Sequence, residues 1–147
     1  MTAPHLALGA EGESRAAVHL ERRGYRIVAR NVRAGRVELD VIAQKSRTLV
    51  FVEVKSRRAG GPQGFGGHAQ AAESVDERKQ ARLRRGARAW LQAHPLERRR
   101  AQHVRFDVIT CLRETPRGPD GPDSGLQNDD TAPGGARWSI EHWEAAF

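Results

Sequence analysis

Hydrophobic and polar positions along the chain repeat with two different periods, and the changes of period mark the expected elements. In residues 10–23 apolar residues recur at helical spacing, with Ala16, Ala17 and Leu20 on one side, and Gly24 ends the pattern. Residues 25–32, 37–43 and 48–55 are typical of strands, and the short polar stretch between the last two predicts a hairpin. The first part of the chain therefore predicts a helix followed by three meandering strands.

The second part of the chain predicts another helix and two more strands. Residues 74–93 carry an apolar stripe that includes Leu83, Ala87 and Trp90, with arginines on the other side. After an arginine-rich connection at 96–102, a strand is expected at 104–112, and a last strand follows Trp138. The crossover from strand 48–55 to strand 104–112 is long enough for a parallel connection. The predicted fold class is α/β, with a mixed central sheet flanked by helices.

Three stretches lack the pattern of a packed element. Residues 1–9 predict a flexible leader, and residues 56–73, rich in Gly, Ala and Gln, predict a mobile loop. Residues 113–136 are mostly Pro, Gly, Asp, Asn, Thr and Arg, a composition that buries too little apolar area to offset the entropy lost on ordering. We therefore expect one domain made of residues 10–112 and 137–147, with a disordered insertion at 113–136.

The charge of the chain points to the class of partner. The 147 residues carry a formal net charge of +7, nearly all of it from arginine, since the only lysines are Lys45, Lys55 and Lys79. A strongly basic protein favours a polyanionic partner such as nucleic acid, although a solvated arginine-rich surface would have the same charge. The single cysteine, Cys111, excludes an intrachain disulfide and is interpreted as a core residue. Neither a long apolar run nor a secretory signal pattern is found, which predicts a cytoplasmic protein without membrane contact.

Two neighbouring predicted strands each carry acidic residues on one face. In strand 48–55, Glu53 and Lys55 point the same way. In the preceding strand Glu38 and Asp40 share one face, and the apolar residues at 37, 39, 41 and 43 are expected to share the other. One hairpin register sets Asp40 opposite Glu53, and a slip of two residues sets Glu38 there instead. Glu13 lies within the apolar side of the first helix and is expected to point at the sheet.

Such a cluster of carboxylates repels itself unless the pKa values rise or a cation neutralises the charge. Oxygen ligands suit Mg²⁺ or Mn²⁺, so the pattern predicts a metal site built from Asp40, Glu53 and Glu13, with Glu38 as an auxiliary residue. A solvent-facing salt-bridge ladder would give the same pattern in the strands, and a Glu favoured by the helix dipole would explain Glu13. Lys79, at the edge of the second helix's apolar face, either reaches this site or bounds the core, and we favour the core.

Arginines outside these strands are candidates for gripping backbone phosphates without reading base sequence. The candidates are Arg57, Arg58, Arg78, Arg82, Arg85, Arg98, Arg99 and Arg100.

Several short segments together resemble a known family. They include Gly12-Glu13-Ser14-Arg15-Ala16-Ala17, Arg30-Asn31, Glu38-Leu39-Asp40-Val41-Ile42-Ala43, Phe51-Val52-Glu53-Val54-Lys55, Arg105-Phe106-Asp107-Val108-Ile109 and Ile140-Glu141-His142. In this combination the chain resembles the YraN-type uncharacterised bacterial proteins of the restriction-endonuclease-like, PD-(D/E)xK superfamily.

The resemblance implies an αβββαβ core similar to that of Holliday-junction resolvases. It implies that Asp40 and Glu53 are metal ligands, that Lys55 is the active-site lysine, and that Glu13 is the acidic residue carried by the first helix. Val37 departs from the family's usual glycine before the Glu-x-Asp motif. Relatives of this fold often act as dimers, so the resemblance also admits a homodimer.

The expected function is therefore that of a metal-dependent endonuclease that hydrolyses phosphodiester bonds of nucleic acid, with DNA favoured. Two alternatives stay open from the sequence. One is a non-catalytic nucleic-acid-binding protein that keeps the fold. The other is an adaptor that docks partners through Trp138, Trp143 and Phe147.

Overall fold

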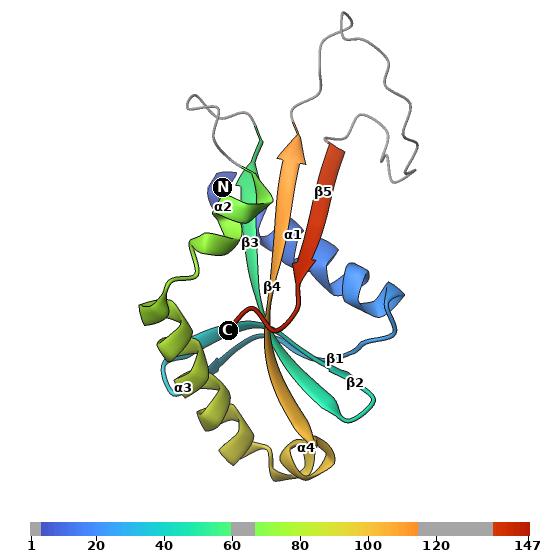
Figure 1. The fold of residues 1–147 in the computed structure, drawn as a ribbon, viewed down its shortest axis with the longest axis vertical. Coiled ribbons are helices and arrows are strands. Elements are labelled where there is room, and N and C mark those ends of the chain that lie inside the picture. The colour runs from blue at the N-terminus through green and yellow to red at the C-terminus, as the bar shows by residue number, and fades with distance from the viewer. Residues whose placement is uncertain (1–3, 60–66, 115–136) are drawn as a thin grey trace, which may run out of the picture.

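A mixed sheet forms the centre of the protein, whose computed structural model describes residues 4–59, 67–114 and 137–147. In these residues the sheet has five strands in chain order. β1 (Arg26–Ala34), β2 (Val37–Lys45) and β3 (Thr48–Arg58) form an antiparallel meander. β4 (His103–Glu114) pairs in parallel with β3, and β5 (Arg137–Trp143) pairs antiparallel with β4 (Figure 1). The predicted mixed α/β architecture, including the parallel crossover, is confirmed.

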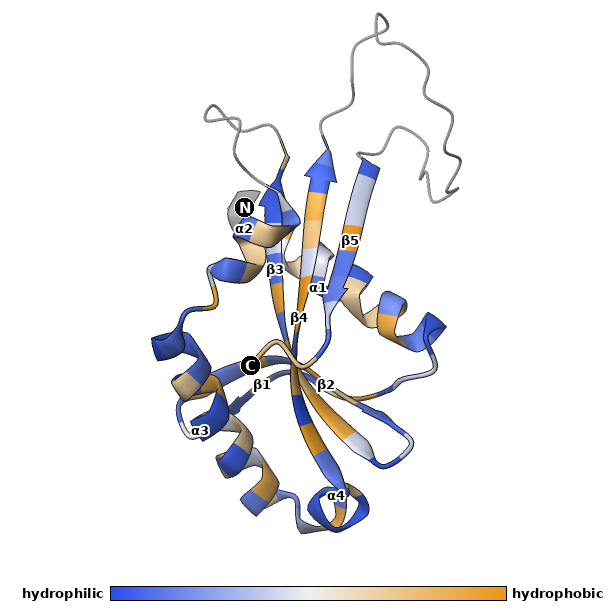
Figure 2. Cartoon of the chain, viewed as in Figure 1, coloured by the Kyte–Doolittle hydropathy of each residue, from blue (hydrophilic) through white to orange (hydrophobic). Residues whose placement is uncertain are grey.

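Helices cover both faces of this sheet because the strands bury apolar side chains on both sides. α1 (Pro4–Arg22) packs on one face, where Ala16 and Leu20 meet Val50 and Val52. α3 (Glu77–Ala93) packs on the other, where its buried stripe meets a second cluster around Phe51. α2 (His68–Glu73) and α4 (Pro95–Arg100) flank α3 in the crossover (Figure 1). Figure 2 shows hydrophobic residues along β3 and β4, which, like β2, have a neighbouring strand on each side.

Two glycines allow the helices to approach the sheet closely. A Cβ added at Gly12 of α1 would lie 2.9 Å from Ser56 Cβ and still closer to Ser56 Oγ. A Cβ added at Gly86 of α3 would lie 2.9 Å from Val37 Cβ. Both distances are shorter than side chains tolerate in a close-packed interior. The two glycines therefore fix how near α1 lies to β3 and how near α3 lies to β2.

The side-chain alternation of β2 changes phase at Asp40. Val37 and Leu39 pack under α3, whereas Val41 and Ala43 pack under α1. The prediction that these four residues share one face is therefore wrong. Opposite Asp40, between the pairs Arg30–Val41 and Val32–Leu39, β1 carries Asn31 with a φ of 50°. A left-handed residue turns a strand out of the regular pleat, and Asn tolerates that conformation better than most side chains.

Several element boundaries differ from those expected. α1 begins at Pro4, so residues 4–9 are helical rather than a flexible leader. The expected loop at 56–73 is wrong at both ends, because β3 continues to Arg58 and residues 68–73 form α2. The arginine-rich connection forms α4, which Pro95 begins at a position where a helix needs no N–H donor. β4 extends to Glu114, so residues 113 and 114 belong to a strand. Residues 115–136, the rest of the expected insertion, lie outside the described residues, as do residues 1–3 and 60–66.

The aromatic residues near the C-terminus do not form one exposed patch. Trp138 packs with the cluster under α1, while Trp143 and Phe147 pack with the cluster under α3. All three are partly buried, and they lie on opposite faces of the sheet, so the docking patch proposed for an adaptor is not formed. Cys111 of β4 is fully buried against α1, in agreement with its predicted core position. Among the helices of the described ranges, none is long and apolar enough to cross a bilayer.

Candidate active site

A cleft lined mainly by charged side chains lies where α1, β2, β3 and α3 meet. Its volume is about 320 Å³. Its polar lining consists of Glu13, Glu38, Asp40, Glu53, Lys79 and Arg82. All four carboxylates that the sequence singled out therefore face one cleft, although they come from three different elements.

The end of the β2–β3 ladder brings Asp40 and Glu53 together. The ladder runs from Lys45–Thr48 to Val41–Val52, and its register continues to Asp40 opposite Glu53. This is the first of the two registers considered above. Beyond Val52 the strands separate, and the backbone N–H of Val54 donates to Asp40 Oδ2 at 2.9 Å. A carboxylate thus accepts a hydrogen bond that a regular strand partner would otherwise take.

Burial and the charges of neighbouring carboxylates raise the pKa values of Asp40 and Glu13. Burial, followed by the charge of Glu53, raises the pKa of Asp40 to about 8, although the Val54 N–H opposes the shift. Asp40 also hydrogen-bonds the side chain of Glu53, as a protonated carboxyl beside a carboxylate can. Burial raises the pKa of Glu13 too, and the charges of Glu38 and Glu53 add to that increase. The repulsion in the cleft is thus relieved by a proton on Asp40, and a bound cation would relieve it as well.

Two lysines contact the same oxygen of Glu53, whose side chain is only 7% exposed. Lys55 Nζ lies 3.5 Å from Glu53 Oε1, and Lys79 Nζ lies 2.7 Å from it. Burial, and then the proximity of Lys79, lowers the pKa of Lys55. Burial alone would lower the pKa of Lys79, but its hydrogen bonds with Glu53 and Lys55 outweigh that effect and raise it. The preference for Lys79 as a residue that only bounds the core is therefore wrong.

The position of Lys79 follows from how α3 begins and packs. Asp76 caps the helix by accepting a hydrogen bond from the backbone N–H of Lys79 at 2.9 Å. Lys79 is four residues before Leu83 and therefore extends the buried stripe by one turn. With Gly86 against Val37, that face of the helix points at the strand that carries Asp40. The helical spacing from Leu83 was the signal that could have placed Lys79 in the site.

Asn31 is a site residue that the sequence reasoning did not identify as functional. Its side chain hydrogen-bonds the half-buried Glu13 and opposes the rise of that group's pKa. Arg30, the neighbouring residue, donates from Nη2 to Ser14 Oγ at 3.2 Å and also lowers the pKa of Glu13 through its charge. An asparagine within a strand is an unusual choice and was the available signal. Arg30 and Asn31 of β1 thus orient Glu13, which is carried by α1.

The carboxylate oxygens of the cleft meet only part of the requirement for binding a hard divalent cation such as Mg²⁺. Among the described residues, no three His, Cys, Asp or Glu side chains lie close enough together to form a ready-made ligand set. Asp40 and Glu53 are nonetheless in hydrogen-bond contact, and Mg²⁺ is commonly held by one or two carboxylates together with water and substrate phosphate. These two residues could hold such an ion, with Glu13 further away on the cleft wall. The predicted roles of Asp40, Glu53 and Glu13 as ligands stay predictions.

The candidate phosphate-binding arginines are all exposed but do not lie together. Arg82 lines the cleft, and the charge of Arg57 acts on Lys55. The run from Arg98 to Arg100 lies in α4, beyond the far end of α3. From Lys79 to the last residue of α3 is about 21 Å at the rise of an α-helix. Arg57 and Arg82 are therefore near the carboxylates, and the α4 arginines are remote from them.

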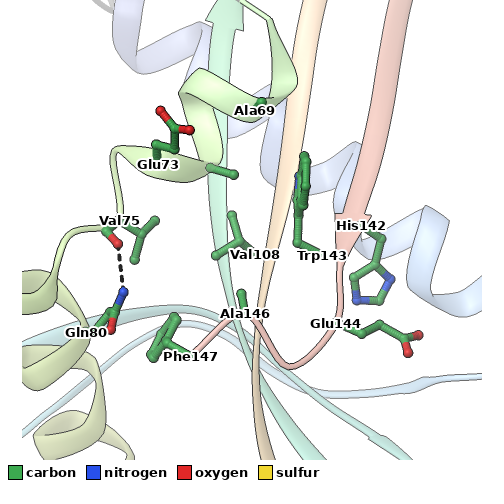
Figure 3. A pocket seen from close by; sticks show the side chains of 11 residues that line it. Ala69, Glu73, Val75, Gln80, Val108, His142, Trp143, Glu144, Ala146 and Phe147 are labelled. Atoms are coloured by element: carbon green, nitrogen blue, oxygen red, sulfur yellow. Dashed lines mark hydrogen bonds between the residues drawn. The ribbon is translucent and has the colours of Figure 1, made fainter.

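A second pocket, of about 560 Å³, lies between α2, α3 and the C-terminal residues (Figure 3). Val75, Val108, Trp143 and Phe147 contribute much of its wall. Figure 3 shows Glu73 and Glu144 on opposite sides of the pocket, without a shared focus. Although larger, it lacks the converging charged groups, among the described residues, that a hydrolytic site requires.

An ion pair between Arg105 and Asp107, both on β4, lies outside the cleft and has a structural role. Asp107 is fully buried and accepts hydrogen bonds from Arg105 Nε at 2.8 Å, His142 Nε2 at 2.7 Å and the backbone N–H of Ala145 at 2.9 Å. These contacts lower the pKa of Asp107 although its burial acts in the opposite direction. Through His142 and Ala145, Asp107 ties the C-terminal segment to β4.

Comparison with known proteins finds similarity to one family. The model of the uncharacterised protein family UPF0102 matches residues 12–111. A UPF0102 protein of Corynebacterium efficiens is 51% identical over 106 residues, covering 71% of this chain and 77% of its own. One of Acidothermus cellulolyticus is 45% identical over 120 residues, covering 77% and 86%. One of Chlorobaculum tepidum is 41% identical over 149 residues, covering 100% and 95%. The matched region contains every residue that lines the cleft.

Proposed function

The chain belongs to the uncharacterised protein family UPF0102, and we propose that it is a metal-dependent endonuclease that hydrolyses phosphodiester bonds of nucleic acid, with DNA favoured. The observation that carries this proposal is the contact between Asp40 and Glu53 where β2 and β3 separate, beside two lysines. The raised pKa of Asp40 supports it, because strongly perturbed carboxyl groups in clefts cluster at functional sites.

The residues of the cleft divide the work of phosphodiester hydrolysis between them. Asp40 and Glu53 would hold Mg²⁺ or Mn²⁺, and Glu13 would contact the ion through water. The bound ion would supply a Lewis acid for the phosphate and would lower the pKa of a water ligand. Lys55, held beside Glu53 by its strand, would place its ammonium group against charge that develops on the phosphate. Arg57 and Arg82 would bind neighbouring backbone phosphates.

The test is cleavage of linear, nicked and branched DNA by the purified protein in Mg²⁺ and in Mn²⁺. We expect the Asp40→Ala variant to be inactive and Lys55→Ala to be slower by about 10²–10³-fold, the usual cost of one stabilising donor. Glu21→Ala removes an exposed carboxylate from α1 outside the cleft and is the matched control. An unchanged rate in either cleft variant would refute the role assigned to that residue.

The second candidate is a protein that binds nucleic acid without cleaving it. The observation that favours it is the absence of a complete three-residue ligand set among the described residues. Such a protein would bind DNA with a steep dependence on salt, because binding releases counterions, and would leave the DNA intact in both metals.

Two further parts of the proposal concern the state of the protein in the cell. We place it in the cytoplasm, which a fluorescent fusion would test, and analytical ultracentrifugation would show whether it forms the homodimer that its resemblance to other nucleases admits.

A further inference from the structure

We propose that Lys79 is a counter-ion that occupies the cation's place on Glu53 and is released to bind a backbone phosphate when the metal ion enters. The inference rests on the proposed function and adds to it a residue that couples binding of the metal to binding of the substrate.

The contact between Lys79 and Glu53 is the shorter of the two lysine contacts. Nζ of Lys79 lies 2.7 Å from Oε1, within hydrogen-bond distance, whereas Nζ of Lys55 lies 3.5 Å from the same oxygen. Glu53 is buried, so its carboxylate is costly to leave without a positive partner. Lys79 provides that partner in the absence of metal. A divalent ion at the same oxygen would repel the ammonium group strongly in so enclosed a place.

Lys79 is also the lysine that is able to leave. Its side chain is 33% exposed, against 14% for Lys55. Its backbone is fixed by the Asp76 cap, so only the flexible four-carbon stem has to move. Lys55, by contrast, lies on a central strand, where it pairs with Thr110 of β4. An exchange of cation on Glu53 therefore moves the Lys79 side chain and leaves the sheet unchanged.

The released ammonium group would remain in the cleft. Lys79 and Arg82 lie one helical turn apart and both line it, so the freed lysine and this arginine would face the same phosphates. The cleft would then present positive charge from α3 opposite an ion held by β2 and β3. Metal and phosphate binding would support one another, because each favours the same position of Lys79.

The first experiment measures Mn²⁺ binding by calorimetry in the absence of nucleic acid. We compare the wild type with Lys79→Met, Lys79→Arg and Arg82→Met, and confirm by thermal melting that each is folded. Lys79→Met should bind Mn²⁺ on the order of tenfold more tightly, because the ion no longer displaces a charge-assisted hydrogen bond. Lys79→Arg keeps the counter-ion, and Arg82→Met removes the same charge from the same cleft without touching Glu53, so both should stay within about threefold of the wild type.

The second experiment measures the affinity for duplex DNA in a Lys55→Ala background, in which cleavage is suppressed. Adding Lys79→Met to this background should weaken DNA binding on the order of fivefold with Mn²⁺ present, a typical effect for one coupled site. The same change should have little effect without Mn²⁺, because Lys79 is then held by Glu53.

The outcomes separate this inference from the proposed function. If the wild type binds Mn²⁺ and Lys79→Met binds it equally tightly or more weakly, the inference is overturned and the nuclease proposal is unaffected. Tighter binding in Lys79→Met, together with no cleavage by the wild type, supports the inference and overturns the nuclease proposal. Binding of Mn²⁺ by Lys79→Met alone also supports the inference. Absence of Mn²⁺ binding in every variant overturns both.

Discussion

Metal binding to this cleft should strengthen steeply as the pH rises, because Asp40 has to lose a proton first. Burial, and then the charge of Glu53, raises the pKa of Asp40 to about 8 in the metal-free protein. At pH 7 only about one molecule in ten then carries the ionised carboxylate, and at pH 6 about one in a hundred. A cation binds the ionised form, so its binding releases a proton. The apparent Kd for Mn²⁺ should be weaker by about tenfold at pH 7 and about 100-fold at pH 6 than at pH 9.

The assay is calorimetry across this pH range in two buffers that differ in ionisation enthalpy. The difference in heat between the buffers counts the protons released, which should approach one per ion at about pH 6 and fall towards zero above pH 9. Asp40→Asn is the informative variant. It should bind Mn²⁺ weakly at every pH, with most of this pH dependence lost. An affinity that does not change between about pH 6 and pH 9 would refute the reasoning, as would the same proton release from the variant.

The same raised pKa has a consequence for stability. The folded protein keeps a proton on Asp40 that the unfolded chain loses near pH 4, so this contribution to stability is present below that pH and lost as the pH rises through about 8. Asp40→Asn should therefore melt at a higher temperature than the wild type at pH 9. A lower melting temperature of the variant at that pH would show that Asp40 stabilises the fold as a carboxylate.

Two further predictions concern the packing that holds the cleft together. Gly12→Ala should lower the free energy of unfolding by about 1–3 kcal/mol in urea titrations, because the new Cβ overlaps Ser56. Gly9→Ala in the same helix has no atom within 4 Å of the added Cβ and should instead stabilise the protein by about 0.5–1 kcal/mol, so equal effects of the two changes would contradict the close approach of α1 to β3. Asp107→Asn should lower the free energy of unfolding by about 3–5 kcal/mol, because it leaves the Arg105 guanidinium without its buried carboxylate partner. The exposed Glu141→Gln on β5 should change stability by less than about 0.5 kcal/mol, and a similar small loss in Asp107→Asn would show that the pair is not important for folding.

Short-range patterns in the sequence were enough to predict the strands and the partners within them. Glu53 and Lys55 point the same way because successive side chains of a strand alternate, a rule that depends only on spacing along the chain. The short hairpin limited the register of β2 against β3 to two choices, and one of them set Asp40 opposite Glu53. The mixed sheet also followed from element order, because the stretch between β3 and β4 is long enough for a parallel crossover.

The same local rules failed where a distant segment decides the geometry. Alternation predicted one face for Val37, Leu39, Val41 and Ala43, but the left-handed backbone at Asn31 on the neighbouring strand accompanies a change of phase at Asp40. The composition of residues 56–73 predicted a loop, but residues 68–73 form α2. A helix of only six residues depends on packing more than on intrinsic helix propensity, so composition alone does not reveal it. Its buried residue, Ala71, is the packing that the sequence alone could not supply.

By itself, the sequence determined the five strands and the two long helices, their order, the charge of the protein and the strand face shared by Glu53 and Lys55, because each of these depends on residues that are near one another in the chain. Only the tertiary structure decided that Lys79 pairs with Glu53 and that Asn31 holds Glu13. It also decided that the α4 arginines lie a helix length away from the cleft. These arrangements depend on how closely α1 and α3 pack against the sheet, and that distance is set by contacts such as Gly12 with Ser56 and Gly86 with Val37, between residues far apart in sequence.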